Sequence, residues 1–397
     1  VLAFAAAACN ACTQTASDGD WQTDPPNAHG QSPAFPGQTR APAIHSQFAI
    51  REQVVARHLS HPWGIAFLPD GRMLVTERDG RIRIVTQQGA VSPPLLGLPQ
   101  VARGGQGGWL DIAVTPDFAH DRWVYWSYSE RRGESDEING TSVARARLSA
   151  DERSLENPQT IFRQLPAWRS TRHFGSRLVF DGEGHLFITL GERNTPQSQQ
   201  MAQTLDNDLG KVVRINIDGT IPRDNPFVWR PDARPEIWNY GHRNMQGADI
   251  NPATGVLWTI EHGPRGGDEV NVARPGLNYG WPIITYGEDY SGAPIGAGTT
   301  RHEGMEQPVY YWDPVIAPSG AHFYRGTLFS DWRNDLLIAG LVANALVRLK
   351  LNGEHVVGEE RVVTDQGRVR DVAEASDGAL WIVTDDDDGK LIRLTPQ

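Results

Sequence analysis

Short apolar runs with a period of two recur along the chain from Phe48 onward, and turn residues separate them. In residues 61–77, for example, an apolar strand runs into Pro-Asp-Gly and a second apolar strand follows. Alternating apolar positions on both sides of such a turn predict a β-hairpin. Further hairpins of this kind are predicted at the following ranges: 109–127, 177–191, 247–260 and 369–384.

A further strand follows most of these hairpins, and the repeated units number about six. The units differ in length, which a radial array of four-stranded blades tolerates because insertions lie in loops on one face. We therefore predict an all-β fold, a six-bladed β-propeller of four-stranded antiparallel blades, over residues 44–397. Residues 48–57 are expected to complete the last blade and close the ring. The alternatives, a β-sandwich or two small β domains, are less favoured because no linker-like break follows Ala43.

The first 43 residues differ from the rest in composition. Residues 1–12 are apolar and rich in small side chains, and they contain both cysteines of the chain, Cys9 and Cys12. The run Ala-Ala-Ala-Cys resembles a bacterial lipoprotein cleavage box, so we interpret residues 1–12 as the remnant of an export signal and expect a periplasmic or secreted protein. Lipid attachment at Cys9 and an ordinary cleaved signal with an incidental cysteine are the two alternatives. Residues 13–43 are polar and rich in Pro, Gly, Gln and Ser, which predicts a disordered tether.

The charge and composition argue against several classes of function. A net charge of −11 disfavours a nucleic-acid partner, which requires a basic stripe on the protein. No apolar run after the first segment reaches the roughly 20 residues of a membrane span. Because the chain is free of cysteine after Cys12, it offers no thiolate nucleophile and no cysteine-ligated metal there.

Two polar loops that precede predicted strands carry candidate catalytic chemistry. In residues 171–175, His173 stands at the start of a strand, where an imidazole is able to act as a general base near neutral pH. In residues 241–247, Arg243 beside Asn244 is suited to stabilise negative charge that develops on an oxygen. The alternatives are a structural histidine and an arginine that pairs with a surface carboxylate.

Residues 261–269, with the sequence EHGPRGGDE, form the most specific local run of the chain. Gly and Pro expose backbone carbonyls, and Asp and Glu add charged oxygens, which together suit a hard cation, calcium above all. Residues 278–282 and 287–289 are able to supply further oxygens. The acidic run at residues 385–388, in contrast, is expected to be a solvated turn.

Arg368 and Arg370 lie at positions i and i+2 of a predicted strand, so their side chains share one face. Two guanidinium groups on one face suit a polyanionic ligand that bears carboxylates. Arginines at a strand edge without a ligand are an equally weighted alternative.

Taken in order, these loops resemble the family of soluble aldose sugar dehydrogenases that depend on pyrroloquinoline quinone (PQQ). The similar motifs are residues 105–110 (GQGGWL), 171–175, 210–227, 238–247, 261–269, 278–282 and 368–370. The resemblance extends from about Phe48 to Pro396, and the family folds as a six-bladed propeller. It implies that the chain oxidises aldose sugars at C1 to the aldonolactone, by hydride transfer to PQQ and with calcium as a second cofactor. The electrons would pass to a separate acceptor, since the chain has no Cys-x-x-Cys-His haem motif.

The resemblance also implies roles for residues at matching positions. His173 matches the base that takes the proton from the anomeric hydroxyl of the sugar, and Gln106 matches a residue that lines the pocket of sugar and quinone. The remaining matches are Arg243 and Asn244 at the quinone oxygens, Arg368 and Arg370 on the cofactor, the carbonyls of Gly263 and Pro264 on the calcium that bridges to PQQ, and Glu269, Tyr279, Thr285 and Asp289 at a second, structural calcium.

Three positions depart from the family's pattern. Val342 occupies the place where the family usually offers a lysine to a PQQ carboxylate, Arg172 precedes the base, and Asp313 falls where one relative has tryptophan. Two other functions therefore stay open: a non-catalytic binding propeller that has lost the cofactor, which Val342 favours, and a calcium-dependent lactonase-type hydrolase. The hydrolase has no need of two cofactor-binding arginines, so Arg368 and Arg370 count against it.

Overall fold

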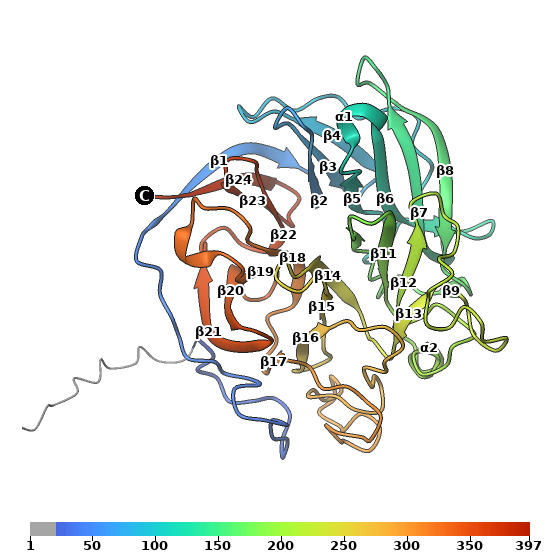
Figure 1. The fold of residues 1–397 in the computed structure, drawn as a ribbon, viewed down its shortest axis with the longest axis vertical. Helices are drawn as coiled ribbons and strands as arrows, with labels where there is room; N and C mark the ends of the chain where they lie inside the picture. The colour runs from blue at the N-terminus through green and yellow to red at the C-terminus, as the bar shows by residue number, and fades with distance from the viewer. Residues whose placement is uncertain (1–20) are drawn as a thin grey trace, which may run out of the picture.

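The computed structural model describes residues 21–397, and β-strands make up nearly all of its regular structure. Six sheets stand around a common axis like the blades of a propeller (Figure 1). The strands nearest the axis are β2 (Pro62–Phe67), β5 (Trp109–Val114), β10 (Leu178–Phe180), β14 (Met245–Ile250), β18 (Pro318–Phe323) and β22 (Val369–Glu374). The prediction of an all-β, six-bladed propeller is therefore confirmed. The predicted export signal, residues 1–12 with Cys9, lies outside the described residues.

Each inner strand begins a blade whose other strands follow it in antiparallel order. These strands are β3 (Met73–Glu77), β4 (Arg81–Val85), β6 (Trp123–Arg131), β7 (Ile138–Leu148), β8 (Leu155–Arg163), β9 (Trp168–Arg169), β11 (His185–Leu190), β12 (Lys211–Asn216), β13 (Ile237–Tyr240), β15 (Leu257–Glu261), β16 (Asp268–Val272), β17 (Tyr310–Trp312), β19 (Leu336–Gly340), β20 (Ala345–Asn352), β21 (His355–Val362), β23 (Leu380–Thr384) and β24 (Gly389–Pro396). The short helices are α1 (Phe118–Asp121), α2 (Pro196–Met201) and the 3₁₀ turn η1 (Ser330–Trp332). No helix in this part of the chain has both the length and the apolar character that crossing a membrane requires.

The first and last blades depart from the simple pattern. In the first blade, residues 91–95 take the fourth place beside β4 through the backbone hydrogen bonds Ser92 N to Ile84 O and Leu95 N to Ile82 O, each 2.9 Å. In the last blade, β1 (Ile50–Leu59) pairs with β24 as the outermost strand. The N-terminal strand thus closes the ring, as predicted for residues 48–57.

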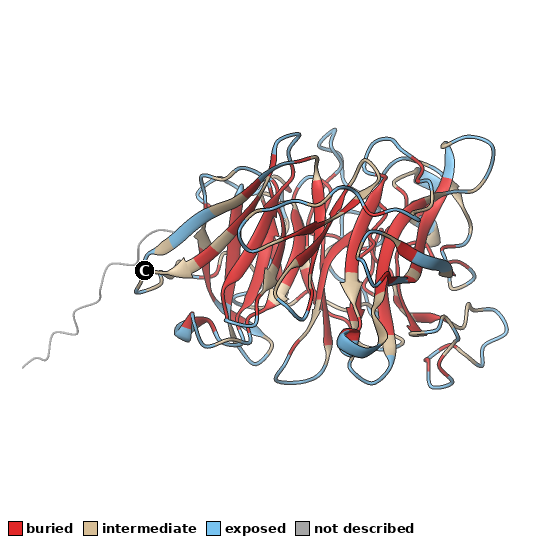
Figure 2. Cartoon of the chain, turned by 90° about the horizontal axis from the view of Figure 1, so that it is seen from above, coloured by how far each residue is buried: buried red, intermediate tan, exposed pale blue. Residues whose placement is uncertain are grey.

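Apolar side chains fill the spaces between neighbouring blades. Trp109 and Trp126 of the second blade pack with Leu74 and Ile82 of the first in one buried cluster, and the two indole rings lie 5.5 Å apart. Both faces of an inner strand are covered in this way, so the strands are buried while the loops at both ends of the blades are exposed (Figure 2).

Three buried carboxylates join inner strands around the axis. Each accepts a hydrogen bond from a backbone N–H of the next blade: Asp111 from Leu178 at 2.7 Å, Asp249 from Phe323 at 2.8 Å and Asp371 from Ile65 at 3.0 Å. The carboxylates come from alternate blades, so they close three of the six junctions between inner strands.

Residues 21–43 lie against the propeller, so the expectation of a disordered tether is wrong for this part of residues 13–43. Gln38 is fully buried, and the backbone N–H groups of Asn27 and Ala28 donate to the carboxylate of Asp313 at 2.8 and 3.0 Å. This polar segment buries only small apolar side chains, those of Ala28 and Ala41, so hydrogen bonds to blade loops do most to hold it in place.

Candidate active site

The loops before four inner strands meet at one end of the central channel, and they carry most of the predicted site residues. The Oε1 atom of Gln106 accepts a hydrogen bond from the backbone N–H of His173 at 2.8 Å. The Oδ1 atom of Asn244 accepts from the backbone N–H of Gly175 at 3.0 Å. Three loops that are far apart in the sequence are thereby joined around the imidazole of His173.

His173 is paired with a carboxylate that the sequence did not reveal. Its Nδ1 atom lies 2.8 Å from Oε1 of Glu192, and both side chains are buried. Glu192 follows Gly191 at the end of β11, and a Cβ on Gly191 would stand 2.2 Å from the carbonyl oxygen of His173. Glycine is therefore required at position 191, where the two segments cross. In the sequence, the only signal that could have pointed to Glu192 is the pair Gly-Glu directly after an apolar strand.

The surroundings of this pair favour a neutral imidazole. Burial, followed by the charges of Arg243, Arg193 and Arg172, lowers the pKa of His173 well below its usual value. Burial raises the pKa of Glu192 to about 7, although Arg243 opposes this shift. An ionised Glu192 accepts a hydrogen bond from Nδ1–H, so the tautomer is fixed and Nε2 is the basic nitrogen of the ring.

Arg243 connects this pair to the predicted calcium loop. Its Nη1 atom donates to the carbonyl oxygens of His262 and Gly263, at 3.1 and 2.7 Å. Its guanidinium lies over the ring of Trp281, 5.2 Å from the ring centre, and its buried Nε atom has no hydrogen-bond partner. Two carbonyl oxygens and an aromatic ring thus hold the guanidinium, and its Nε–H remains free to donate a hydrogen bond to a ligand.

The loop predicted to bind calcium, residues 261–269, is a tight turn that one buried carboxylate holds in place. Asp268 accepts from the backbone N–H of Gly263, and also from those of Ile316 and Ala317, each at 2.8 Å. A Cβ on Gly263 would lie 2.3 Å from the carbonyl oxygen of Gly266, so only glycine fits there. The carbonyl oxygen of Gly263 accepts one hydrogen bond from Arg243 and keeps a second lone pair for a cation.

The two arginines of the last blade lie on the same side of their strand but differ in burial. Arg370 is buried and pairs with Asp385, and it donates to Oε1 of Gln246 at 2.8 Å. Arg368 is half exposed and lies 3.8 Å from the same carboxylate. Asp385 also lies 2.7 Å from Nδ1 of His61, so the expectation that it belongs to a solvated turn is wrong. Burial opposes the shift, but Arg370 and then His61 hold the pKa of Asp385 below its usual value.

The structure brings together three of the four residues predicted for a second calcium. Glu269, Thr285 and Tyr279 line one small cavity. The hydroxyl of Tyr279 donates to the carbonyl oxygen of Val272 at 2.5 Å, so that oxygen is already engaged. Asp289 is exposed and accepts from its neighbour Ser291, and it does not line this cavity.

Two of the departures from the family pattern lie at the same end of the channel. Val342 is 53% exposed in the turn between β19 and β20, where an apolar side chain contributes no charge. Arg172 contributes to the lowered pKa of His173. The third departure, Asp313, is occupied in holding the N-terminal segment against the propeller.

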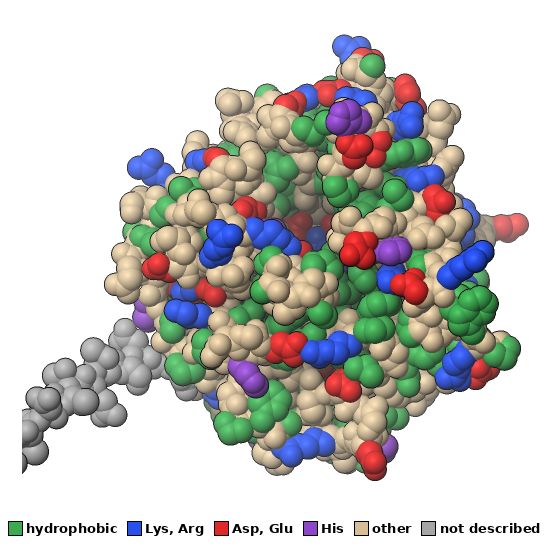
Figure 3. All heavy atoms as spheres, viewed as in Figure 1, with side chains coloured by type: hydrophobic (Ala, Val, Ile, Leu, Met, Phe, Trp, Pro, Cys, Tyr) green, Lys and Arg blue, Asp and Glu red, His purple; other side chains and the backbone are tan. Residues whose placement is uncertain are grey.

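The opposite end of the channel carries none of the predicted site residues. Figure 3 looks onto the face with α1 and shows the ring hollowed near its middle, with acidic and basic side chains at the hollow. His322 lies between Asp249 and Glu374 in the cavity at the ends of the inner strands, at 3.2 and 3.0 Å. These contacts link β14, β18 and β22 across blade junctions, which is a structural role.

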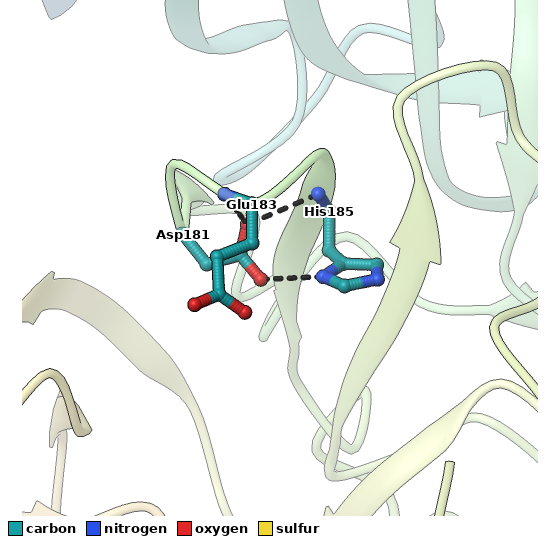
Figure 4. Close-up of side chains that lie close together, drawn as sticks. All are labelled: Asp181, Glu183 and His185. Atoms are coloured by element: carbon teal, nitrogen blue, oxygen red, sulfur yellow. Dashed lines mark hydrogen bonds and ion pairs between the residues drawn. The ribbon is translucent and has the colours of Figure 1, made fainter. Parts of the chain in front are cut away.

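Within residues 21–397, one group of histidine and acidic side chains is close enough to hold a metal ion: Asp181, Glu183 and His185 (Figure 4). Asp181 accepts from the backbone N–H groups of Glu183 and His185 at 2.7 and 3.0 Å, and it lies 2.6 Å from Nδ1 of His185. These bonds close the turn between β10 and β11. The group is therefore explained by the hairpin, and no predicted calcium ligand belongs to it.

Comparison with known proteins identifies what this arrangement resembles. Residues 59–393 match the model of the glucose/sorbosone dehydrogenase family. The aldose sugar dehydrogenase YliI of Escherichia coli is 44% identical over 351 residues, which is 88% of this chain and 93% of that protein. The apo-form crystal structure of the soluble aldose sugar dehydrogenase from Escherichia coli is 44% identical with a TM-score of 0.84, covering 88% of this chain and 100% of that one.

Two relatives have names or titles that mention a quinone. The quinoprotein glucose dehydrogenase B of Acinetobacter calcoaceticus is 26% identical over 427 residues, covering 87% of this chain and 88% of that protein. The PQQ-bound form of the aldose sugar dehydrogenase from Streptomyces coelicolor is 28% identical with a TM-score of 0.74, covering 89% of this chain and 100% of that one.

Proposed function

The chain belongs to the glucose/sorbosone dehydrogenase family, a family of oxidoreductases acting on sugars, and we propose that it oxidises aldose sugars at C1 with PQQ and calcium as cofactors. The observation that carries the proposal is the buried His173–Glu192 pair, which lies beside guanidinium groups with unused donors. A neutral, oriented imidazole next to fixed positive charge is the arrangement that proton removal from a hydroxyl group requires.

The residues at this end of the channel fit an anionic quinone. The Nε atoms of Arg243 and Arg370 and the Nε2 atom of His262 are buried without hydrogen-bond partners, and Arg368 is half exposed beside them. Buried polar atoms without partners are costly, so a ligand that bears carboxylates and carbonyl oxygens would stabilise the two guanidinium donors. Without a lysine at Val342, one charge-assisted hydrogen bond is missing. That loss is expected to weaken PQQ binding by about 1.5–3 kcal/mol, or roughly 10- to 100-fold.

The carbonyl oxygens of Gly263 and Pro264 would hold the calcium at the quinone, and Asn244 would contact the quinone with Arg243. Glu269 and Thr285 would contribute to a second calcium. Desolvation and then the charge of Glu261 hold the pKa of Glu269 well above its usual value, and a bound cation would favour the ionised carboxylate instead. When bound, PQQ supplies a two-electron acceptor and calcium supplies Lewis-acid polarisation.

The chain's own residues would handle the proton of the sugar. The Nε2 atom of His173 accepts the proton of the anomeric hydroxyl group, and the negative charge of Glu192 stabilises the imidazolium that forms. As the proton leaves, electron density rises on the sugar oxygen, and the hydrogen on C1 would leave with its electron pair, as hydride, for the two-electron acceptor that bound PQQ supplies. Arg243 stabilises the negative charge that develops during the transfer. The sugar loses one proton and one hydride and becomes the aldonolactone, and a separate acceptor takes up the electrons.

The test is reduction of an artificial dye by purified protein across a panel of mono- and disaccharides. We expect dye reduction only when PQQ, calcium and an aldose are all present, and loss of activity in excess chelator that calcium restores. PQQ binding without any sugar oxidation would favour a non-catalytic binding propeller. Hydrolysis of an aldonolactone without PQQ would favour a lactonase-type enzyme.

From the composition of residues 1–12, we also propose a periplasmic or secreted location, which cell fractionation would test.

A further inference from the structure

Arg193 is a fully buried arginine directly behind the His173–Glu192 pair. Its Nη2 atom donates to Oδ1 of Asn139 at 2.5 Å and to the carbonyl oxygen of Ser170 at 2.6 Å. These partners are neutral oxygens, and the Nε and Nη1 atoms of the same guanidinium have no hydrogen-bond partner. A buried charge held in this way is costly and is uncommon unless it has a use.

The guanidinium contacts the segment around His173 from two sides. It lies over the ring of Phe174, the residue after His173, at 3.7 Å from the ring centre. It also bonds to Ser170, three positions before His173. Because Arg193 follows Glu192 in the chain, one side chain ties the segment of the base to the segment of its carboxylate partner.

The backbone around this contact adopts conformations that favour glycine. His173, Ser176, Arg193 and Asn194 have φ angles of 51°, 95°, 71° and 53°. Four such residues in two contacting segments store strain, and strain of this kind persists where the surrounding contacts enforce it and clusters at functional sites. The contacts of Arg193 are among those that enforce it here.

We propose that Arg193 is a positioning residue for the sugar-oxidation chemistry, which sets the geometry of the His173–Glu192 pair and places a positive charge behind it. The inference rests on the proposed function. In this proposal Arg193 does not touch the sugar or the cofactor, and it acts only through His173 and Glu192.

The charges that face the pair define what removal of Arg193 should do. His173 is faced by Glu192, Arg243, Arg172 and His262 besides Arg193, and Glu192 is also faced by Glu261. Burial lowers the pKa of Arg193 to about 9, so the group stays charged at neutral pH. Its charge lowers the pKa of both His173 and Glu192. Removing that charge therefore raises both pKa values and moves the acid limb of activity to higher pH.

The test compares Arg193→Met, Arg193→Lys and the control Arg348→Met in full-length protein. Like Arg193, Arg348 is buried and its guanidinium lies over an aromatic ring, here that of Trp332. It differs in pairing with Asp335 and Glu360, at 2.6 and 2.7 Å, in the fifth blade. The readouts are the pH profile of kcat/KM in the PQQ-loaded enzyme, thermal unfolding, and the titration of the His173 ring by NMR in PQQ-free protein.

For Arg193→Met we expect kcat/KM at neutral pH to fall at least about tenfold and the acid limb to move up by about one pH unit. Arg193→Lys keeps the charge, so it should recover most of the pH profile and only part of the rate. Arg348→Met should lower the unfolding temperature and leave the pH profile unchanged. A pH profile and a His173 titration that are unchanged in Arg193→Met would overturn the proposal. If wild-type protein oxidises no sugar, the proposed function fails on its own, while the NMR titration still decides the effect of Arg193 on His173.

Discussion

Replacing Glu192 with glutamine tests the role of the His173 partner with almost no change in shape. In the wild type, Nδ1 of His173 lies 2.8 Å from Oε1 of Glu192, and their side chains are 6% and 0% exposed. A hydrogen bond to a charged group contributes about 1.5–3 kcal/mol, which corresponds to a 10- to 100-fold effect at about 1.4 kcal/mol per decade. If the amide instead presents its NH₂ group to Nδ1, the imidazole adopts the wrong tautomer, and the loss reaches about 10⁴-fold. Glu192→Gln should therefore lower kcat by about 10- to 10⁴-fold.

The same variant makes a prediction about pH. Burial raises the pKa of Glu192 to about 7, so the ionised form that orients His173 is lost as the pH falls below that value. Wild-type activity should decline on the acid side of about pH 7, whereas Glu192→Gln should lack that decline because glutamine does not titrate. The assay is steady-state dye reduction over a range of pH, with PQQ affinity measured as the control for folding of the site. A variant with wild-type kcat and a wild-type pH profile would show that Glu192 does not orient His173.

Three further variants probe other parts of the account. His173→Ala should lower kcat by about 10²–10⁴-fold, the usual contribution of general acid–base catalysis, and leave PQQ affinity unchanged in a calorimetric titration; full turnover would remove His173 from the mechanism. Asp385→Asn should release Arg370 and weaken PQQ binding about 10- to 100-fold by loss of a charge-assisted contact, and an unchanged Kd would contradict this. Asp371 lies 3.1 Å from Nη1 of the buried Arg177, so Asp371→Ala leaves part of that charge buried without its partner and should reduce the free energy of unfolding in urea by about 3–5 kcal/mol; an unchanged unfolding midpoint would show that this contact contributes little.

The fold could be predicted largely because its signals are local. Alternating strands and turn residues lie within about 20 residues of each other in a hairpin, and blades repeat that unit. The segment that completes the first blade, residues 91–95, is harder to recognise in the sequence. It contains Pro93 and Pro94, which lack the backbone N–H that hydrogen-bonds to a neighbouring strand. The packing of residues 21–43 was missed because composition measures apolar content, whereas Asn27 and Ala28 are fixed by hydrogen bonds to Asp313.

The site was only partly predictable, because its residues depend on contacts between distant segments. His173 and Arg243 stand in loops whose sequence is unusual, and the resemblance to a known family pointed to them. Glu192 was missed since its role appears only when β11 brings it 2.8 Å from His173. Asp385 was assigned to a solvated turn because its burial comes from Arg370 and from His61, which is 324 positions away in the chain. Sequence patterns show which groups exist, and the fold decides which of them meet.

The most direct test of the central claim is a crystal structure of the protein with PQQ, calcium and an aldose. We expect PQQ at the end of the channel formed by the loops of His173 and Arg243, with its oxygens on Arg243 and Arg370 and with the calcium on the carbonyls of Gly263 and Pro264. The anomeric hydroxyl group of the sugar should face Nε2 of His173. Ligand bound at the opposite mouth of the ring, or a sugar whose C1 lies away from His173, would contradict it.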